Sequence, residues 1–294
     1  MNLFQKFFLQ QPDLAAREQP ALNLLFDRRP DTTAAVLEAR LGELSALEPL
    51  RTTPRLEVEA DWQSSSLLLA VLTFDDHRIE IAGFSAPMPA ASIERCILAS
   101  SWSADFKELL QSHLLYVVLC YEGTHTDPIE QHIALYKAAR LFAGDELLGV
   151  ANEPAWTCHP APLIGQITEL ALLPVCRQSP PLVYWTGFVK GLLGEEYWAL
   201  TKGFHLFGVA DLATVVLNQE DLQRWHEVFQ EVFHYLYFEK ADVQAGDALQ
   251  IDEQTFLLFE AIPDSHDALR AVSETLAVRE ASADEVEFWQ LGQN

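Results

Sequence analysis

The sequence predicts an α+β fold with mixed, largely antiparallel sheets and helices packed on one face. Three pairs of strand-like segments are each separated by a tight turn, which is the pattern of β-hairpins. Helical segments with recognisable capping residues lie between these pairs, so the order is not the strict alternation of a doubly wound fold. Both halves share a rough helix–strand–hairpin order, which leaves open a duplicated β-α-β-type core.

The first hundred residues contain strand-like runs bounded by turn residues, at 22–26, 56–60, 67–74 and 77–83. Asp75-Asp76 separates the last two runs and predicts a hairpin. Asp31 is a favourable N-cap residue, and it precedes apolar residues at helical spacing up to Leu44. A second helix is expected to carry Ile93 and Ile97 after Pro89.

The middle of the chain continues with a strand and two helices. The segment 113–121 is almost wholly apolar, as expected of a strand that is buried on both faces. Asp127-Pro128-Ile129-Glu130 then places an acceptor at the N-cap, proline at the first helical position and glutamate at the third. A short strand is expected at 147–150. A further helix is expected to begin at Pro160 and to end at Pro174.

The last third is predicted to contain two hairpins and a long helix. Segments 182–190 and 197–202 form one hairpin, and 248–251 and 255–260 form the other, with Asp252-Glu253 at its turn. Asn218 is expected to cap the long helix, because Glu220 and Asp221 then lie favourably in its first turn.

The domain organisation follows from these elements. Residues 1–20 form an amphipathic N-terminal lead, whose apolar stripe of Leu3, Phe4, Phe7 and Phe8 is expected to dock onto the body. Residues 21–262 form a single α+β domain or two similar halves, about 21–110 and 111–262. Residues 263–294 are expected to form an acidic helical tail.

The charge of the chain restricts its partners. Forty-three Asp and Glu face nineteen Lys and Arg, which gives a formal net charge of -24. Such a surface repels nucleic acid and anionic membranes and accelerates encounter with basic proteins. The acid is densest near the C-terminus, where residues 239–294 contain thirteen Asp and Glu and three Lys and Arg. We therefore expect a basic protein partner, and neither nucleic acid nor a membrane.

The four cysteines, Cys96, Cys120, Cys158 and Cys176, show no C-x-x-C spacing and lie in or beside apolar runs. They are expected to be buried free thiols, which suits a reducing compartment. The N-terminus lacks a continuous apolar region and a small-residue cleavage site, and no apolar run approaches the roughly 20 residues of a membrane helix. These features predict a cytoplasmic protein.

Three short motifs suggest chemistry, and each has a simpler structural interpretation. His226-Glu227 approaches the H-E-x-x-H zinc motif, but Gln230 replaces the second histidine, and His234 follows one turn later. A polar shoulder on an amphipathic helix is the preferred interpretation of these residues. We expect no metal and no cofactor.

The other two motifs are Cys158-His159 and His125-Thr126-Asp127. Adjacent cysteine and histidine side chains rarely reach hydrogen-bond geometry, and His159 before Pro160 is typical of helix entry. The capping role of Asp127 already explains the third motif. No catalytic residue is assigned, and whether the protein is an enzyme stays open. A hydrolase would gather His113, His125, His159 or His205 with a carboxylate and a nucleophile in a cleft.

Aromatic residues are concentrated in two stretches, 184–207 and 225–238. Most are expected to pack in the core. The alternative is an aromatic patch that anchors a protein partner, because Trp and Tyr dominate interface hot spots.

Short motifs between about Ile79 and Val216 carry a resemblance. They are Ala86-Pro87-Met88-Pro89, Ser101-Trp102, Ser112-His113-Leu114, Leu148-Gly149-Val150, Trp156, His159-Pro160, Leu182-Val183-Tyr184-Trp185, Leu200-Thr201-Lys202-Gly203-Phe204 and Phe207-Gly208. In order and approximate spacing they resemble the bacterial family known as domain of unknown function 4261, over roughly half of the chain. The resemblance implies an α+β bacterial cytoplasmic protein and no particular activity.

Together these features predict an acidic protein-binding protein, foremost an immunity (antitoxin) protein that neutralises a basic effector toxin, such as one from a secretion system. An effector adaptor or chaperone, and a hydrolase with an unrecognised site, are the alternatives. The residues expected to bind the partner are Asp242, Asp247, Asp252, Glu253, Asp264, Asp267, Asp284, Glu285, Glu287 and Trp289.

Overall fold

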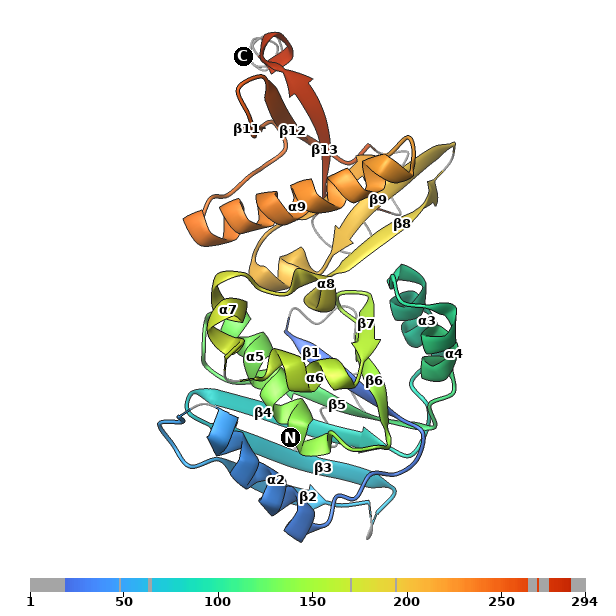
Figure 1. Cartoon of the computed structure of the whole chain (residues 1–294), viewed down its shortest axis with the longest axis vertical. Helices are drawn as coiled ribbons and strands as arrows, with labels where there is room; N and C mark the ends of the chain where they lie inside the picture. Colours follow the sequence, from blue (N-terminus) through green and yellow to red (C-terminus); the bar gives the residue numbers. More distant parts are fainter. Residues whose placement is uncertain are drawn as a thin grey trace. The chain divides into compact units, whose positions relative to one another are not determined.

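A computed structural model of the chain describes residues 19–47, 49–62, 65–169, 171–193, 195–263, 269 and 275–286. The structure contains helices and two mostly antiparallel sheets, which confirms the α+β class (Figure 1). The chain divides into two compact units, Met1–Gly187 (unit 1) and Phe188–Asn294 (unit 2). This boundary does not lie near residue 110, where a division of residues 21–262 into two halves was expected. The N-terminal lead lies outside the described residues, apart from its last two.

Unit 1 contains a seven-stranded sheet with the strand order β2-β3-β4-β5-β1-β6-β7. Each strand is antiparallel to its neighbours. The strands are β1 (Ala21–Phe26), β2 (Arg55–Ala60), β3 (Leu67–Phe74), β4 (His77–Phe84), β5 (Leu115–Tyr121), β6 (Leu147–Asn152) and β7 (Thr157–Pro160). The predicted hairpin at Asp75-Asp76 joins β3 to β4, and Asp75 takes the positive φ of 49° that a tight turn requires.

Helices cover both faces of this sheet, so β1 and β5 are buried at every position. One apolar cluster joins Cys96 and Ile97 of α3 (Ala90–Ala99) and Leu110 of α4 (Ala104–Gln111) to strand residues such as Cys158. The next residue, His159, points to the opposite face, where Tyr136 of α5 (Pro128–Ala139) contacts it. The expectation of helices on one face therefore does not hold for unit 1.

The other helices of unit 1 are α2 (Ala34–Leu47), η2 (Arg140–Phe142), α6 (Pro162–Ile167), α7 (Leu173–Gln178) and α8 (Leu182–Trp185). Asp127 caps α5 as predicted, by accepting a hydrogen bond from the backbone N–H of Ile129 at 2.9 Å. Three expectations were wrong. Pro160 ends strand β7 and does not begin a helix, Pro174 lies in the first turn of α7, and Leu182 begins a helix instead of a strand.

Unit 2 contains a six-stranded sheet with the order β11-β12-β13-β10-β9-β8. Its elements are β8 (Gly187–Leu193), β9 (Glu196–Lys202), η3 (Phe204–Phe207), β10 (Asp211–Val215), α9 (Gln219–Glu239), β11 (Ala248–Gln250), β12 (Thr255–Ala261) and β13 (Thr275–Ser282). Asn218 caps α9 as predicted, with its side chain accepting from the N–H groups of Glu220 and Asp221. Phe229 and Phe233 on this helix contact aromatic rings of β8 and η3, so aromatic packing holds α9 in place.

Strand β13 overturns the expectation of a helical tail, because part of residues 263–294 lies inside the sheet. It pairs antiparallel with β12 and parallel with β10, through Asp211–Ala213 and Thr275–Ala277. The two sheets have different strand orders, so they do not show the duplicated core that the sequence left open.

All four cysteines are buried free thiols, as predicted. None of the helices among the described residues is long and apolar enough to cross a membrane.

Asp211, at the start of β10, is a buried carboxylate with several polar partners. It is 0% exposed. Its Oδ1 accepts hydrogen bonds from the backbone N–H of Phe204 at 2.9 Å and from Thr201 at 3.3 Å. Its Oδ2 lies 2.7 Å from His205 Nδ1 and 3.7 Å from Lys202 Nζ. Burial lowers the pKa of Lys202, and the nearby Asp211 carboxylate opposes that shift. One side chain thus fixes the whole connection from β9 through η3 to β10.

We expect Asp211→Asn to lower the free energy of unfolding by about 3 kcal/mol, because it removes the negative charge that faces the buried Lys202 ammonium. Chemical denaturation followed by tryptophan fluorescence measures the change. Asp242→Asn is the matched control, because Asp242 is exposed and the same substitution there should cost less than about 0.5 kcal/mol. Equal effects of the two substitutions would contradict the structural role of Asp211.

Candidate functional site

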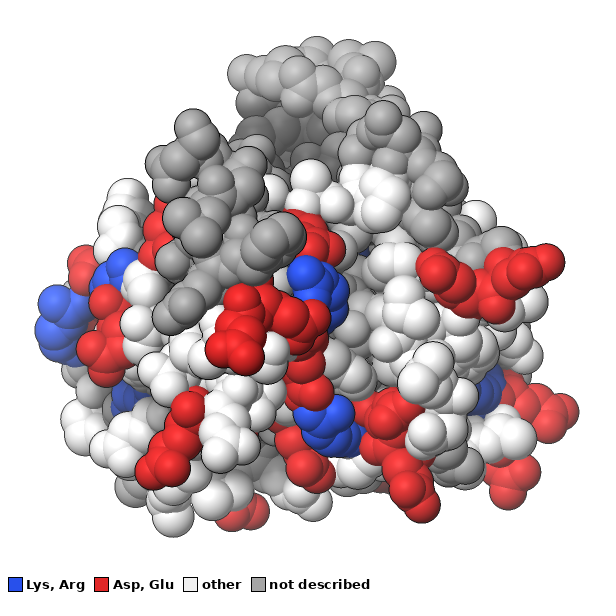
Figure 2. Space-filling view, turned by 90° about the horizontal axis from the view of Figure 1, so that it is seen from above, with Lys and Arg blue, Asp and Glu red and all other residues white. Residues whose placement is uncertain are grey.

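Six of the ten residues predicted to bind a partner lie among the described residues, and all six are exposed: Asp242, Asp247, Asp252, Glu253, Asp284 and Glu285. The other four, Asp264, Asp267, Glu287 and Trp289, lie outside the described residues. Figure 2 shows one face of the molecule on which Asp and Glu side chains surround single Lys and Arg side chains.

The pairing of β12 with β13 brings four of these acids together. Thr255 lies opposite Ser282. Asp252 and Glu253 lie three and two residues before Thr255, in the β11–β12 turn, whereas Asp284 and Glu285 lie two and three residues after Ser282, the last residue of β13. The two acidic pairs therefore share one end of the sheet, and we call these four residues the acidic tip.

Local hydrogen bonds hold two carboxylates of the acidic tip. Asp252 Oδ1 accepts from the backbone N–H groups of Gln254 and Thr255, both at 2.8 Å, and these bonds lower the pKa of Asp252. Glu285 Oε2 accepts from the backbone N–H of Ser282 at 2.8 Å and from its hydroxyl at 3.0 Å, which lowers the pKa of Glu285. Both side chains are ionised and oriented at neutral pH.

Asp242 and Asp247 do not join the acidic tip. The backbone carbonyl of Asp247 accepts from the N–H of Phe259, which lies four positions beyond Thr255 on β12. At about 3.3 Å per residue this separates Asp247 from the tip by roughly 13 Å. Asp247 Oδ2 also accepts from the backbone N–H of Gln244 at 2.7 Å, so it shapes the loop that leads into β11.

A pocket of about 430 Å³ opens where β10 and β13 separate after their short parallel pairing. The first turns of α9, which follows β10 directly, form one wall. In open α/β sheets, ligands often bind in a crevice at the carboxyl ends of the strands, and this pocket lies at the carboxyl ends of the paired segments of β10 and β13. The lining is mostly apolar: Trp198, Val215, Leu217, Trp225, Pro263, Ala277 and Val278, with Thr214. Leu217 is 88% exposed, so apolar surface continues out of the pocket.

Five charged residues surround this apolar lining: Asp221, Arg224, Glu260, Arg279 and Glu280. Arg224 forms an ion pair with Glu280, and Arg279 Nε lies 3.0 Å from Glu260 Oε1. Arg279 Nη1 also lies 3.9 Å from Glu285 Oε1 of the acidic tip. The pocket and the acidic tip are therefore neighbouring parts of one surface on unit 2. The sequence contained no signal for this pocket, because its walls come from segments far apart in the chain.

The zinc-like motif on α9 has aromatic neighbours. His226 packs edge-on against Phe188 with ring centroids 5.0 Å apart, and His234 stacks on Phe238 at 5.2 Å. Gln230 Nε2 lies 3.3 Å from His226 Nε2. In the described part of the chain, no group of three or more His, Cys, Asp or Glu side chains is arranged to hold a metal ion.

Cys158 and His159 point to opposite faces of the unit 1 sheet. His159 Nδ1 donates to the carbonyl of Pro160 at 3.0 Å, so Nε2 is the acceptor for the Tyr136 hydroxyl at 2.7 Å. Burial lowers the pKa of His159 to about 4 and raises that of Tyr136. His159 is therefore a neutral core histidine with both nitrogens bonded.

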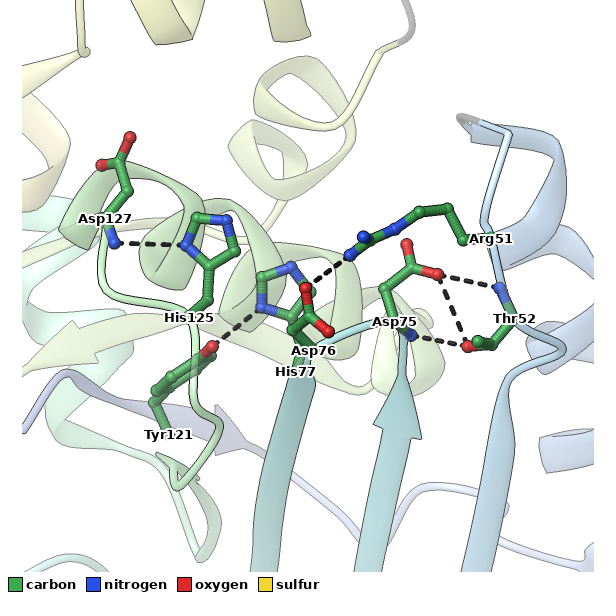
Figure 3. A network of polar contacts seen from close by, with 8 residues as sticks. All are labelled: Arg51, Thr52, Asp75, Asp76, His77, Tyr121, His125 and Asp127. Atoms are coloured by element: carbon green, nitrogen blue, oxygen red, sulfur yellow. Dashed lines mark hydrogen bonds and ion pairs between the residues drawn. The ribbon is translucent and has the colours of Figure 1, made fainter.

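Two other motifs, Asp75-Asp76 and His125-Thr126-Asp127, meet in space around His77 (Figure 3). The rings of His77 and His125 stack with centroids 5.3 Å apart, and His77 Nδ1 shares a hydrogen bond of 2.9 Å with the Tyr121 hydroxyl. His125 Nδ1 accepts from the backbone N–H of Asp127 at 3.2 Å. Burial, with the positive charge that His125 can carry, lowers the pKa of His77 to about 4.

The same network binds the β3–β4 turn from its other side. Arg51 forms an ion pair with Asp76, and the backbone N–H of Thr52 donates to Asp75 Oδ1 at 2.9 Å (Figure 3). The backbone N–H of Thr124 donates to the carbonyl of Asp76 at 3.1 Å. These contacts bind two loops to the tip of the hairpin. Asp75-Asp76 and His125-Thr126-Asp127 therefore have a structural role in holding this part of the fold together. The sequence missed His77, which follows the turn as an ordinary strand residue.

The four histidines considered for a hydrolase have different hydrogen-bond partners. His113 Nδ1 donates to the carbonyl of Leu110 and its Nε2 accepts from the N–H of Met88, whereas His125 belongs to the hairpin network. His159 bonds Tyr136, and His205 bonds Asp211 in unit 2. Each histidine therefore has its own partners in a different part of the fold.

We expect His159→Gln to make the protein less sensitive to acid, because glutamine can keep both hydrogen bonds and does not titrate. In the unsubstituted protein, His159 takes up a proton near pH 6.5 when the chain is unfolded. In the folded state it does so only near pH 4, because burial lowers its pKa. Stability is therefore lost as the pH falls below 6.5. Between pH 7.5 and pH 5.5 the native protein should lose about 1 to 1.5 kcal/mol more than the variant. Denaturation curves at the two pH values measure this difference, and parallel losses would contradict it.

In comparisons with known proteins, no family model, no curated protein and no solved structure matches this chain. The resemblance to domain of unknown function 4261 therefore rests on the sequence motifs alone and stays a prediction.

Proposed function

We propose that the chain is a binding protein for a basic protein partner, and that it acts as an immunity protein that neutralises a basic effector toxin. The observation that carries this proposal is the surface of unit 2, where the acidic tip lies beside an apolar pocket and shares Arg279 with its rim. Charge and apolar anchoring side by side are what a fast and durable protein complex requires.

The charge is concentrated in the proposed binding unit. Unit 2 contains twenty Asp and Glu and six Lys and Arg, a net charge of -14 over 107 residues, whereas unit 1 carries -10 over 187 residues. A field of this sign attracts basic proteins and raises their association rates, and salt weakens the effect. An immunity protein benefits from such steering, because it must reach its toxin before the toxin reaches its target.

The pocket supplies the second requirement. Buried aromatic residues surrounded by a polar rim are typical of positions that dominate binding energy, and Trp198 and Trp225 line this pocket. Such anchors act mainly on dissociation, whereas exposed charges act mainly on association. The separate hydrogen-bond partners of His113, His125 and His159 in unit 1 likewise support binding over hydrolysis.

An effector adaptor or chaperone would use the same surface, so the distinction lies in what happens to the partner. An immunity protein suppresses the toxicity of its partner when the two are expressed together in a bacterium that lacks both. An adaptor leaves the toxicity of its effector unchanged. Co-expression with the captured partner therefore decides between the two functions.

We expect neutralisation of the acidic tip to slow partner binding at least about tenfold, because it removes four charges that steer the encounter. The variant is Asp252→Asn, Glu253→Gln, Asp284→Asn and Glu285→Gln, whose amide oxygens retain the local hydrogen bonds of the turn. The tagged full chain is purified from the organism that encodes it, and association rates of the captured partner are measured at low and moderate salt.

The matched control removes four exposed charges from unit 1, by Glu57→Gln, Glu59→Gln, Glu94→Gln and Glu108→Gln. It should slow association less than about threefold, because these residues lie outside the proposed surface. An equal loss in both variants would contradict binding through unit 2. Recovery of the chain without any partner at both salt concentrations would contradict the proposed function itself.

A further inference from the structure

The pocket between β10 and β13 combines an apolar interior with a charged rim, and this combination restricts what can enter it. A purely apolar side chain would not interact with the charged rim, which carries one more carboxylate than guanidinium groups. A compact ion would make no use of the apolar lining, which includes Trp198 and Trp225. An arginine side chain has both parts, because its methylene stem covers apolar surface while its planar head makes charged hydrogen bonds.

The charges of the rim favour a cation. Three carboxylates, those of Asp221, Glu260 and Glu280, face two guanidinium groups, those of Arg224 and Arg279. The four carboxylates of the acidic tip lie next to this rim, since Glu285 Oε1 lies 3.9 Å from Arg279 Nη1. An anionic group would therefore be repelled, whereas a guanidinium ion would relieve the excess of negative charge.

The pocket wall already holds one guanidinium group against an indole. The guanidinium carbon of Arg224 lies 5.9 Å from the ring centroid of Trp225. This distance is within the range of cation–π attraction, which is strongest for tryptophan. The wall is thus chemically suited to the group that we infer from the charges.

We propose that this pocket receives an arginine side chain of the basic partner, with the methylene stem on the apolar lining and the guanidinium group at Glu260 and Glu280. The inference rests on the proposed function and adds the chemical identity of the anchoring residue. A partner that lacks an accessible arginine would then bind only weakly through the acidic tip.

A peptide titration of the full chain tests this inference. The probe is a ten-residue peptide of alternating glycine and arginine. The comparison peptides carry citrulline, which is neutral and has the same shape, or norleucine, which is apolar, in place of arginine. The readout is the ¹H–¹⁵N indole signals of Trp198 and Trp225. We expect the arginine peptide to shift these signals saturably and to bind at least fivefold more tightly than either comparison peptide.

Two variants locate the binding site. The double variant Glu260→Gln with Glu280→Gln should bind the arginine peptide at least fivefold more weakly than the native chain does. The control, Glu231→Gln with Glu239→Gln, removes two exposed charges from α9 outside the pocket and should change affinity less than twofold. Equal affinity of the citrulline peptide, tighter binding of the norleucine peptide, or equal losses in both variants would each overturn the inference. The peptide comparison on the native chain does not depend on how well any variant folds.

The outcome also separates this inference from the proposed function. If the arginine peptide does not bind at the indoles while the native chain still captures a basic partner in a salt-sensitive way, the pocket inference is wrong and the proposed function stands. If the peptide binds at the indoles but no partner is recovered, the pocket binds arginine and the proposed function fails.

Discussion

The buried carboxylate of Asp211 is the constraint on which the proposed binding surface depends. It fixes the turn from β9 through η3 and thereby places the first residue of β10. The backbone of the same residue begins the parallel pairing of β10 with β13, opposite Thr275. Because the parallel pairing is short, the two strands then separate, and the pocket lies in the gap. An interaction in the core thus determines a feature of the surface.

The acids of unit 2 have two roles that depend on each other. Asp252 and Glu285 stabilise the local turns by accepting backbone hydrogen bonds, and the same bonds keep their carboxylates ionised and fixed in direction. A field produced by oriented side chains is better defined than one produced by mobile ones. In unit 1, by contrast, the titratable core residues His132 and His159 are neutral, since burial lowers the pKa of each to about 4.

The sequence predicted best those features that depend on neighbours in the chain. The caps at Asp127 and Asn218 and the turn at Asp75-Asp76 were predicted correctly, because each is built from a few consecutive residues. Strand β13 was missed, since its pairing with β10 joins segments far apart in the sequence and an acidic, alanine-containing stretch is also compatible with a helix. Leu182–Trp185 was misassigned, because a short apolar run does not distinguish a strand from a buried helical turn.

The candidate site likewise has parts that the sequence predicts and parts that depend on contacts between distant segments. The sequence identified the acids near the C-terminus, and the pairing of Thr255 with Ser282 decided which of them lie together. The pocket had no signal in the sequence. Hydrogen–deuterium exchange of the full chain, alone and in complex with its captured partner, is the most direct measurement of the central claim. Protection on binding should appear at 221–225, 252–255 and 278–286. Protection confined to residues 19–187 would contradict the account.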